Sequence, residues 1–251
     1  MSNARPALER LKARLRPLPA TRLLILLTHL VRNADDRSVA LLRLVRPHGL
    51  FQPYRTTGAN RYPELFRFVR DLIGDGPDRR ILSFGCSTGE EVFSLRSYFP
   101  TAAIKGIDIN RRSIRLCRER LARLGGAPRL SFACASSAAG EEAGTYDAVF
   151  AMAVFRHGDL SFGPPRCDHR LRFAAFEEAV AHLARSLKPG GLLVIRHANF
   201  RFGDTKVAAG FHQVHAIAAD PARPDSSPLY GPDHCRMAET RRDDGVYRKL
   251  G

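Results

Sequence analysis

The sequence predicts an α/β fold: a doubly wound, mostly parallel sheet with an N-terminal helical extension. Three observations lead to this prediction. From about residue 80 onwards, short apolar runs alternate with segments whose apolar residues recur at helical spacing. A glycine turn joins the first apolar run to the first of these helical segments. Residues 146–155 form a near-continuous apolar run, as expected for a strand buried on both faces.

Residues 1–50 are predicted to form a basic helical N-terminal extension. Leucines recur at helical spacing between residues 8 and 31, with Pro17 and Pro19 separating two helices. A further helical pattern over residues 39–45 ends before Pro47. Residues 1–70 carry 14 Lys or Arg and 4 acidic residues, so most of the chain's formal charge of +15 lies there.

This charge favours an acidic substrate, nucleic acid or an anionic surface as partner. The alternative is that a GC-rich genome produces the Arg-rich composition. The aromatic residues of this part form no recognisable base-stacking motif. Nucleic acid and an anionic surface are therefore the less favoured partners.

Residues 51–78 are predicted to form a segment that leads into the main domain. Its polar and aromatic string over residues 54–62 has the character of a lid over a ligand pocket, with a surface linker as the alternative. Pro63 suits the first turn of a helix that runs to about Ile73, where Gly74 and Gly76 end it.

Residues 79–251 are predicted to form the main domain, in which strands and helices alternate. Helices are expected after the glycine turn, from about residue 110 to the Gly125-Gly126 pair, and over residues 173–187. The two closing strands depend on weaker patterns than the others. The predicted strands are residues 81–84, 103–109, 130–135, 146–155, 192–197, 207–218 and 246–250.

The glycine turn reads G-x-x-x-G, from Gly85 to Gly89, with Glu90 and Glu91 at the start of the following helix. A helix N-terminus favours a diphosphate only when positive potential dominates there, and two carboxylates would repel that ligand. A carboxylate can instead receive an ammonium group, so the turn suits the amino-acid part of S-adenosylmethionine. The alternative is that both glutamates only complement the helix dipole.

Asp108 lies at the end of the second predicted strand, about 20 residues beyond the glycine turn. Ligands of open α/β sheets bind beyond the carboxyl ends of the strands, where an acidic residue holds the ribose hydroxyls. A role for Asp108 as a helix cap is the alternative.

Composition agrees with one large α/β domain plus an extension. The five cysteines show neither paired spacing nor a zinc-type cluster, so we expect a reducing, cytoplasmic location and no metal. No apolar run approaches the length of a membrane span, and no secretory signal is visible at Met1.

Four motifs occur in an order that resembles class I S-adenosylmethionine-dependent methyltransferases, over residues 79–200. They are Phe84-Gly-Cys-Ser-Thr-Gly-Glu-Glu, Gly106-Ile-Asp-Ile, Tyr146-Asp-Ala-Val-Phe and Leu187-Lys-Pro-Gly-Gly-Leu-Leu-Val. The resemblance implies the Rossmann-like methyltransferase fold and S-adenosylmethionine as cofactor. The run from Ser87 to Glu91 is most similar to the chemotaxis-receptor (CheR-like) glutamate methyltransferases.

The resemblance also implies which residues contact the cofactor. The glycine turn would hold the methionine part, the second strand the ribose, the end of the third strand the adenine, and the end of the fourth strand would border the methyl group. In that order, the residues are Gly85, Cys86, Ser87, Gly89 and Glu90; Asp108 and Ile109; Ala135 and Ser136; Met152 and Ala153.

Two departures argue against receptor glutamates as the substrate. The chemotaxis family usually has an Arg-Asn pair after the fourth strand, where this chain has Met152 and Ala153. The receptor-docking β-insertion of that family has no evident counterpart in this sequence. The methyl acceptor is therefore unidentified.

A carboxylate acceptor needs no general base, whereas a hydroxyl or amine acceptor can require one. His197, after the fifth strand, and His157, after the fourth, are the candidate catalytic residues, with His197 preferred. The remaining candidates would contact the substrate. The alternative is that those before residue 63 belong to a surface linker and that those after residue 198 only anchor the fifth strand. These candidates are Tyr54, Arg55, Tyr62, Asn199, Arg201 and Asp204.

The sequence thus predicts a methyltransferase that moves a methyl group by in-line displacement. Two alternatives stay open: a non-catalytic module that binds S-adenosylmethionine, and a nucleotide-dependent oxidoreductase on the same fold. The first would bind the cofactor and methylate nothing. The second is opposed by the missing middle glycine and by Glu90 and Glu91.

Overall fold

The computed structural model describes residues 33–217, 227–238 and 241–251. The chain divides into two compact units, residues 1–46 and 47–251. In the first unit, α3 (Ala34–Val45) begins after Asn33, whose side-chain oxygen accepts hydrogen bonds from the backbone N–H groups of Asp35 and Asp36. The two helices predicted between residues 8 and 31 lie outside the described residues.

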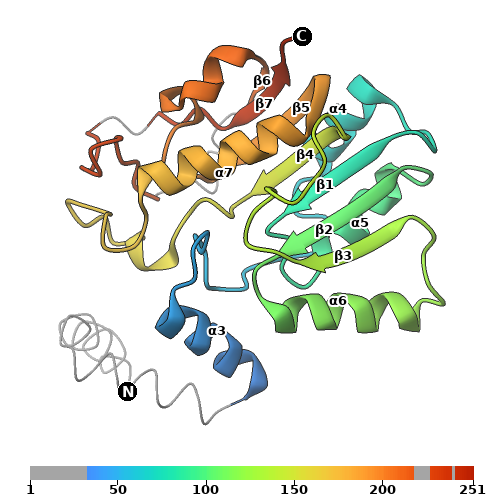
Figure 1. The fold of residues 1–251 in the computed structure, drawn as a ribbon, viewed down its shortest axis with the longest axis horizontal. Helices are drawn as coiled ribbons and strands as arrows, with labels where there is room; N and C mark the ends of the chain where they lie inside the picture. Colours follow the sequence, from blue (N-terminus) through green and yellow to red (C-terminus); the bar gives the residue numbers. More distant parts are fainter. Residues whose placement is uncertain (1–32, 218–226, 239–240) are drawn as a thin grey trace, which may run out of the picture. The chain divides into compact units, whose positions relative to one another are not determined.

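The second unit contains a seven-stranded sheet in the order β3-β2-β1-β4-β5-β7-β6 (Figure 1). Every neighbouring pair is parallel except those made by β7, which runs antiparallel to both β5 and β6. The prediction of a doubly wound, mostly parallel sheet is therefore confirmed. The strands are β1 (Arg80–Phe84), β2 (Ala103–Asp108), β3 (Leu130–Cys134), β4 (Tyr146–Met152), β5 (Leu187–Arg196), β6 (Phe211–Ala216) and β7 (Gly245–Lys249).

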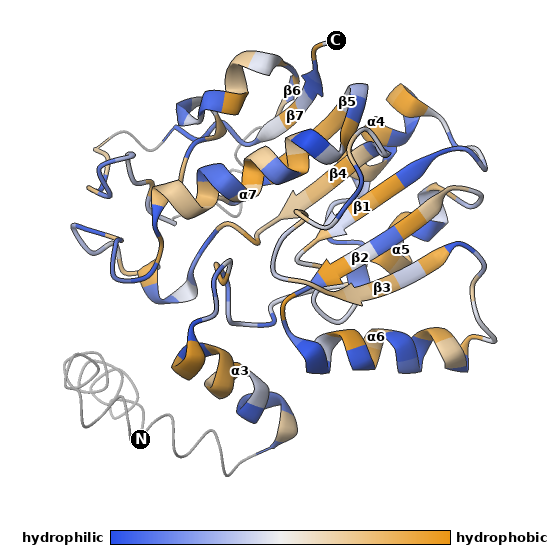
Figure 2. Cartoon of the chain, viewed as in Figure 1, coloured by the Kyte–Doolittle hydropathy of each residue, from blue (hydrophilic) through white to orange (hydrophobic). Residues whose placement is uncertain are grey.

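Helices cover both faces of the sheet. In Figure 1, α7 crosses in front of the sheet while α4 and α5 lie behind it. Both α6 and α7 alternate hydrophobic and hydrophilic residues along their length (Figure 2), as helices with one buried side do. The helices of this unit are α4 (Pro63–Ile73), α5 (Glu90–Tyr98), α6 (Arg111–Arg123) and α7 (Phe173–Ser186), with short 3-10 helices η1 (Gly158–Leu160), η2 (Phe202–Asp204) and η3 (Lys206–Gly210).

Two hydrophobic clusters follow from this arrangement. On one face, Phe176 and Val180 of α7 pack with Val149 of β4. On the other, Phe66 of α4 and Leu95 of α5 pack with alternate residues of the same strands. Because each central strand is buried on both faces, β4 is fully apolar apart from Asp147.

The first three strands agree with the prediction to within one residue at each end, whereas β4 and β5 differ by more. β4 ends at Met152 instead of residue 155, because Ala153 adopts a left-handed conformation with φ of 57°. β5 begins at Leu187 instead of residue 192, with an irregular register opposite Tyr146 and Ala148 of β4. β6 is shorter than the predicted range of 207–218, and β7 has the predicted length but begins one residue earlier.

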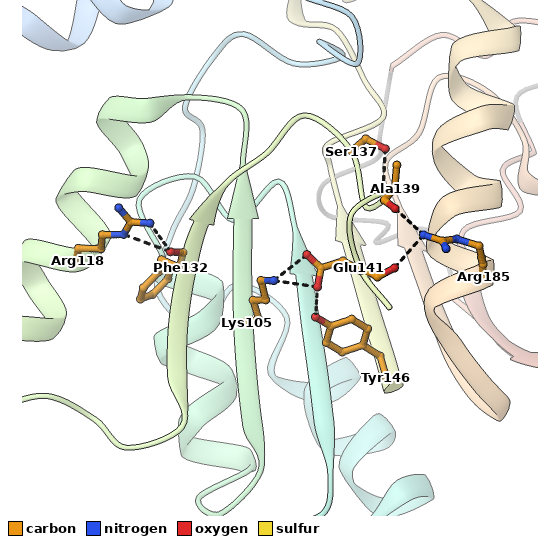
Figure 3. Close-up of polar contacts among 8 residues, drawn as sticks. All are labelled: Lys105, Arg118, Phe132, Ser137, Ala139, Glu141, Tyr146 and Arg185. Carbon is orange, nitrogen blue, oxygen red and sulfur yellow. Dashed lines mark hydrogen bonds and ion pairs between the residues drawn. The ribbon is translucent and has the colours of Figure 1, made fainter. Parts of the chain in front are cut away.

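The connection from β3 to β4 crosses the sheet without forming a helix. Glu141 of this connection accepts hydrogen bonds from Lys105 of β2, at 2.8 and 2.9 Å, and from the Tyr146 hydroxyl (Figure 3). Arg185 of α7 donates hydrogen bonds to the backbone oxygens of Ala139 and Glu141. A partly buried network of charged and polar groups thus attaches this connection to the sheet.

The strand order reverses between β1 and β4. The chain proceeds from β1 to β2 and β3 on one side, and from β4 to β5 on the other. In open α/β sheets, the crevice beyond the carboxyl ends of the strands at such a point is where ligands bind. The glycine turn follows β1 directly and lies at this point.

Candidate cofactor and acceptor site

The glycine turn is held against the end of β2 by its own backbone. The N–H groups of Gly85 and Cys86 both donate to the Ile107 carbonyl oxygen, at 2.8 and 3.0 Å. Gly85 has φ of 76°, and a Cβ placed there would lie 2.5 Å from a methyl group of Val154. Gly89, with φ of 86°, caps α5. Both glycines are therefore required by backbone conformation, and Gly85 also by close packing.

Asp108 connects β2 to this turn. Its carboxylate accepts hydrogen bonds from the backbone N–H groups of Ser87, at 2.8 Å, and Asn110, at 2.7 Å. Burial raises the pKa of Asp108, while these hydrogen bonds and the nearby Arg55 act in the opposite direction. The N-terminal cap of α6 is Asn110, whose side chain accepts from two backbone N–H groups. Asp108 itself is thus not the helix cap that the alternative interpretation required.

Glu90 and Glu91 have different surroundings. Glu90 forms an ion pair of 2.6 Å with Arg120 of α6, and both side chains are partly exposed. Glu91 is mostly withdrawn from solvent, and accepts a hydrogen bond of 2.7 Å from the Ser83 hydroxyl of β1. Burial raises the pKa of Glu91 to about 7, against the lowering effects of Ser83 and Arg61. The second glutamate is therefore a largely buried acid beneath the turn.

Ser87 contains a buried polar atom that the chain does not satisfy. Its hydroxyl oxygen has no hydrogen-bond partner, and its φ of 50° is left-handed. An unpaired buried hydroxyl costs free energy, and strained residues cluster where ligands bind. Together with Asp108 and the neighbouring glutamates, this atom fits a ligand with hydroxyl, amine and carboxylate groups.

The residues predicted to lie near adenine adjoin those predicted to hold ribose. The Ala135 N–H donates to the Asp108 carbonyl oxygen at 3.0 Å, and the Cys134 thiol lies 3.6 Å from the Ile109 carbonyl oxygen. A Cβ on Gly49 would lie 2.5 Å from the Ser136 carbonyl oxygen, so the chain near Gly49 passes directly over Ser136. The contacts place the predicted ribose and adenine residues side by side, and their roles in binding stay predictions.

Left-handed residues follow both β4 and β5. Ala153, after Met152, and His197, after Arg196, each have φ of 57°. The Ala153 N–H donates to the Arg196 carbonyl oxygen at 2.8 Å, which joins the two strand ends. The buried Asp244 accepts from the His197 N–H at 2.8 Å and so maintains that conformation. Each such residue costs about 1–2 kcal/mol, so the packing must impose it.

Two aromatic residues of the 51–78 segment reach the loops after β4 and β5. The Tyr54 hydroxyl donates to Asp159 at 2.5 Å. The Tyr62 ring lies 6.0 Å from the His197 ring, between centroids. Arg55 of the same segment is close enough to Asp108 to lower its pKa, so the segment lies near both the strand ends and the predicted ribose residue. The arrangement is the one expected of a lid, which stays a prediction.

The remaining candidates are placed as follows. Nδ1 of the buried His157 accepts from the Asp159 N–H at 3.1 Å. Asn199, 1% exposed, accepts from the His157 N–H at 2.8 Å and donates to the Pro228 carbonyl oxygen at 2.7 Å. Arg201 and Asp204 flank Phe202 of η2, which packs against Tyr247 of β7. Asn199 thus joins separate segments, which suits an anchoring role.

Sequence reasoning overlooked three arginines in this region. Arg196 begins the polar run at the end of the fifth strand and Arg61 belongs to the string over residues 54–62, but neither they nor Arg156 are among the predicted site residues. The guanidinium groups of Arg196 and Arg61 lie 4.8 and 5.3 Å from the centre of the Tyr62 ring. No local pattern marks them, because only the fold brings the ends of β4 and β5 to Tyr62.

The described residues contain no group of three or more His, Cys, Asp or Glu that could hold a metal ion. Among the helices of the described part of the chain, none has the length and apolar character needed to cross a membrane.

The sheet order is that of a Rossmann-like domain, and the candidate site lies where the strand order reverses. Residues 82–193 match a family model described as a methyltransferase domain. This segment includes the glycine turn, Asp108 and the ends of β3 and β4. This part of the chain is therefore similar to methyltransferase domains. No curated protein matches the sequence.

Several solved structures resemble the chain. Geranyl diphosphate C-methyltransferase from Streptomyces coelicolor A3(2), in complex with S-adenosyl-L-homocysteine, has 16% identity and a TM-score of 0.40, over 53% of this chain and 44% of that one. The YcgJ protein from Bacillus subtilis has 14% identity and a TM-score of 0.40, over 53% and 50%. Phosphoethanolamine N-methyltransferase 2 from Haemonchus contortus has 16% identity and a TM-score of 0.41, over 66% and 32%. The chain spans half or less of the length of these proteins.

Proposed function

We propose that this protein transfers a methyl group from S-adenosylmethionine to an acceptor bound beyond the ends of β4 and β5. One observation carries the proposal: the methyltransferase match over residues 82–193 contains a glycine turn whose Ser87 hydroxyl is buried without a partner and whose backbone is bonded to Asp108. The two alternative functions have no such specific support.

The residues of the turn and of β2 would hold the cofactor. The Asp108 carboxylate retains lone pairs for ribose hydroxyls after accepting from Ser87 and Asn110. Ser87 would donate to the methionine part, and Glu91 would face its ammonium group. Ammonium binding would favour the charged form of Glu91, whose pKa of about 7 places it near its titration point at neutral pH.

When bound, the cofactor supplies an electrophilic methyl group on a sulfonium. The main contribution of the chain is to position the acceptor, because an in-line displacement needs the acceptor aligned with the methyl group. The left-handed turns at Ala153 and His197 hold the strand ends, and Tyr54 and Tyr62 would cover the acceptor.

If the acceptor is a hydroxyl or amine, His197 is the preferred base. Nδ1 of His157 already accepts a backbone hydrogen bond, so neutral His157 carries its proton on Nε2 and has no free lone pair in the ring. His157 could act only after losing that bond. The resemblance of the Ser87 to Glu91 run to chemotaxis-receptor methyltransferases, and a cytoplasmic location, stay predictions from the sequence.

The test is calorimetric titration of the purified protein with S-adenosylhomocysteine and with NAD. We expect the first to bind and the second not to bind. Asp108→Asn should weaken S-adenosylhomocysteine binding by about 1–3 kcal/mol, because a hydrogen bond to a charged group is lost. Asp168→Asn is the matched control, since Asp168 forms an exposed ion pair with Arg166.

Absence of heat with S-adenosylhomocysteine would refute the proposal. Activity requires a second measurement, in which the protein and methyl-labelled S-adenosylmethionine are incubated with a small-molecule extract. Cofactor binding without any labelled product would favour the non-catalytic alternative.

A further inference from the structure

Two guanidinium groups lie beside the Tyr62 ring at the carboxyl ends of β4 and β5, and a third arginine follows β4 closely enough to act on the same side chain. Arg61 precedes α4, Arg156 follows β4, and Arg196 is the last residue of β5. Arg196 lies 4.8 Å and Arg61 5.3 Å from the centre of the Tyr62 ring, and Arg156 is near enough to lower the pKa of Tyr62. None of the three guanidinium groups makes a hydrogen bond or ion pair with another described residue.

Other arginines of the fold form ion pairs with acidic residues. Arg79 pairs with Asp147 at 3.0 Å, Arg120 with Glu90 at 2.6 Å, and Arg170 with Asp159 at 3.1 Å. Three guanidinium groups near one side chain repel one another, and Glu91 is the one acid that acts on the same tyrosine. An anion between them would remove that repulsion.

Tyr62 provides a second, independent observation. Its side chain is 8% exposed, and its hydroxyl is buried without a hydrogen-bond partner. A buried hydroxyl without a partner calls for an explanation, and a ligand oxygen is one. The nearby acid is Glu91, which is already bonded to Ser83. The charges that act on Tyr62 are therefore three positive groups and one negative group.

We propose that Arg61, Arg156 and Arg196 bind a carboxylate or phosphate group of the methyl acceptor, with the Tyr62 hydroxyl as a further donor. This inference rests on the proposed methyltransferase function, because Glu91 next to the cluster directly follows the cofactor turn. Guanidinium groups recognise both kinds of anion through paired N–H donors. The acceptor is thus an anionic molecule.

The cofactor also has a carboxylate, which could engage these arginines. One carboxylate needs a single bidentate guanidinium, and three arginines exceed that requirement. Arg156 and Arg196 belong to the β4 and β5 side, whereas Asp108 belongs to β2 on the other side of β1. The position of Arg156 and Arg196, away from Asp108, favours the acceptor over the cofactor as the ligand of the arginines.

The experiment uses the full chain saturated with S-adenosylhomocysteine and titrated with benzoate, phenyl phosphate and the neutral benzamide. We expect at least one of the two anions to bind more tightly than benzamide. Arg156→Met and Arg196→Met should each weaken anion binding about tenfold, since a charge-assisted hydrogen bond is lost. Arg67→Met is the control, because Arg67 is exposed on α4 and should leave binding unchanged.

Tyr62→Phe separates ligand binding from a structural role. Because its hydroxyl has no partner in the chain, we expect unchanged or higher thermal stability together with weaker anion binding. Lower stability with unchanged anion binding would exclude Tyr62 from the site.

Equal binding of benzoate, phenyl phosphate and benzamide, or arginine variants that bind the anions normally, would overturn the inference. Titration with 5′-methylthioadenosine, which lacks the amino-acid part, tests the cofactor explanation. If the arginine variants weaken S-adenosylhomocysteine but not 5′-methylthioadenosine, the cluster serves the cofactor and the inference is wrong while the proposed function stands. If the wild-type protein binds no S-adenosylhomocysteine, the proposed function fails, and anion titration of the unliganded protein still tests the cluster.

Discussion

Glu91 shows how a single side chain is changed by its neighbours. Two adjacent glutamates begin α5, but one is paired with Arg120 near the surface and the other is mostly withdrawn from solvent and bonded to Ser83 of β1. Desolvation disfavours the charged form of a carboxylate, and it raises the pKa of Glu91 to about 7. A proton is therefore bound more tightly in the folded than in the unfolded chain.

The sign of the resulting pH dependence follows from this difference. Between pH 4.5, the ordinary value, and pH 7, the folded state binds a proton on Glu91 that the unfolded state has lost. The free energy of unfolding should therefore fall as pH rises through this window, by up to about 3 kcal/mol. Urea unfolding at pH 4.5 to 8 measures it.

Glu91→Gln should remove this component, because the amide does not titrate. Glu119→Gln, which changes an exposed glutamate of α6, should keep the wild-type profile. Identical profiles for Glu91→Gln and the wild type would show that Glu91 ionises in the folded protein as it does in the unfolded chain.

Packing between elements depends on one glycine of β2. A Cβ on Gly106 would lie 2.8 Å from Val92 of α5, 2.9 Å from the Cys86 sulfur and 3.0 Å from the Phe132 ring. These neighbours belong to the cluster beneath the glycine turn. The close approach of α5 to the sheet thus requires a residue without a side chain.

Gly106→Ala should lower the free energy of unfolding by about 1–3 kcal/mol through overpacking. Gly210→Ala should have little effect, because no atom lies within 4 Å of a Cβ at that position. Adding Val92→Ala to Gly106→Ala should recover part of the loss in chemical denaturation. No recovery would mean that Val92 is not the limiting contact.

The connection between β3 and β4 depends on the network in Figure 3. In a double-mutant cycle of Lys105→Met and Glu141→Leu, we expect a coupling of about 1–3 kcal/mol, since Glu141 is nearly buried and also accepts from Tyr146. The pair Arg115 and Glu119 on α6 is exposed, and its cycle should give less than about 0.5 kcal/mol. Equal coupling energies in the two cycles would show that the Lys105 and Glu141 pair stabilises the fold no more than an exposed ion pair.

Ligand binding should stabilise the folded chain as one thermodynamic unit. S-adenosylhomocysteine at about 100 times its dissociation constant should add about 2.7 kcal/mol, because it binds only the folded state. Thermal unfolding with and without the ligand measures this gain, and NAD at the same concentration is the control. A gain in Asp108→Asn equal to that of the wild type at the same ligand concentration would contradict the role of Asp108.

Local signals in the sequence were sufficient for the fold class and for the position of the glycine turn. Apolar periodicity distinguishes strands from helices, and the glycines of the turn adopt φ values that other residues avoid. Both are properties of neighbouring residues, so they are visible without the fold. The predicted positions of strand ends were less accurate. The end of β4 depends on the left-handed conformation of Ala153, which contacts with β5 impose.

The chemistry of the candidate site depends on contacts between distant residues. The burial of Glu91, the meeting of Tyr62 with Arg196, and the support of His197 by Asp244 each join separate segments. The antiparallel β7, inserted between β5 and β6, likewise reflects strand pairing and not its own residues. Desolvation and charge act through space, so their effects appear only when the chain is folded, whereas turn geometry and periodicity act along the chain and can be read directly from it.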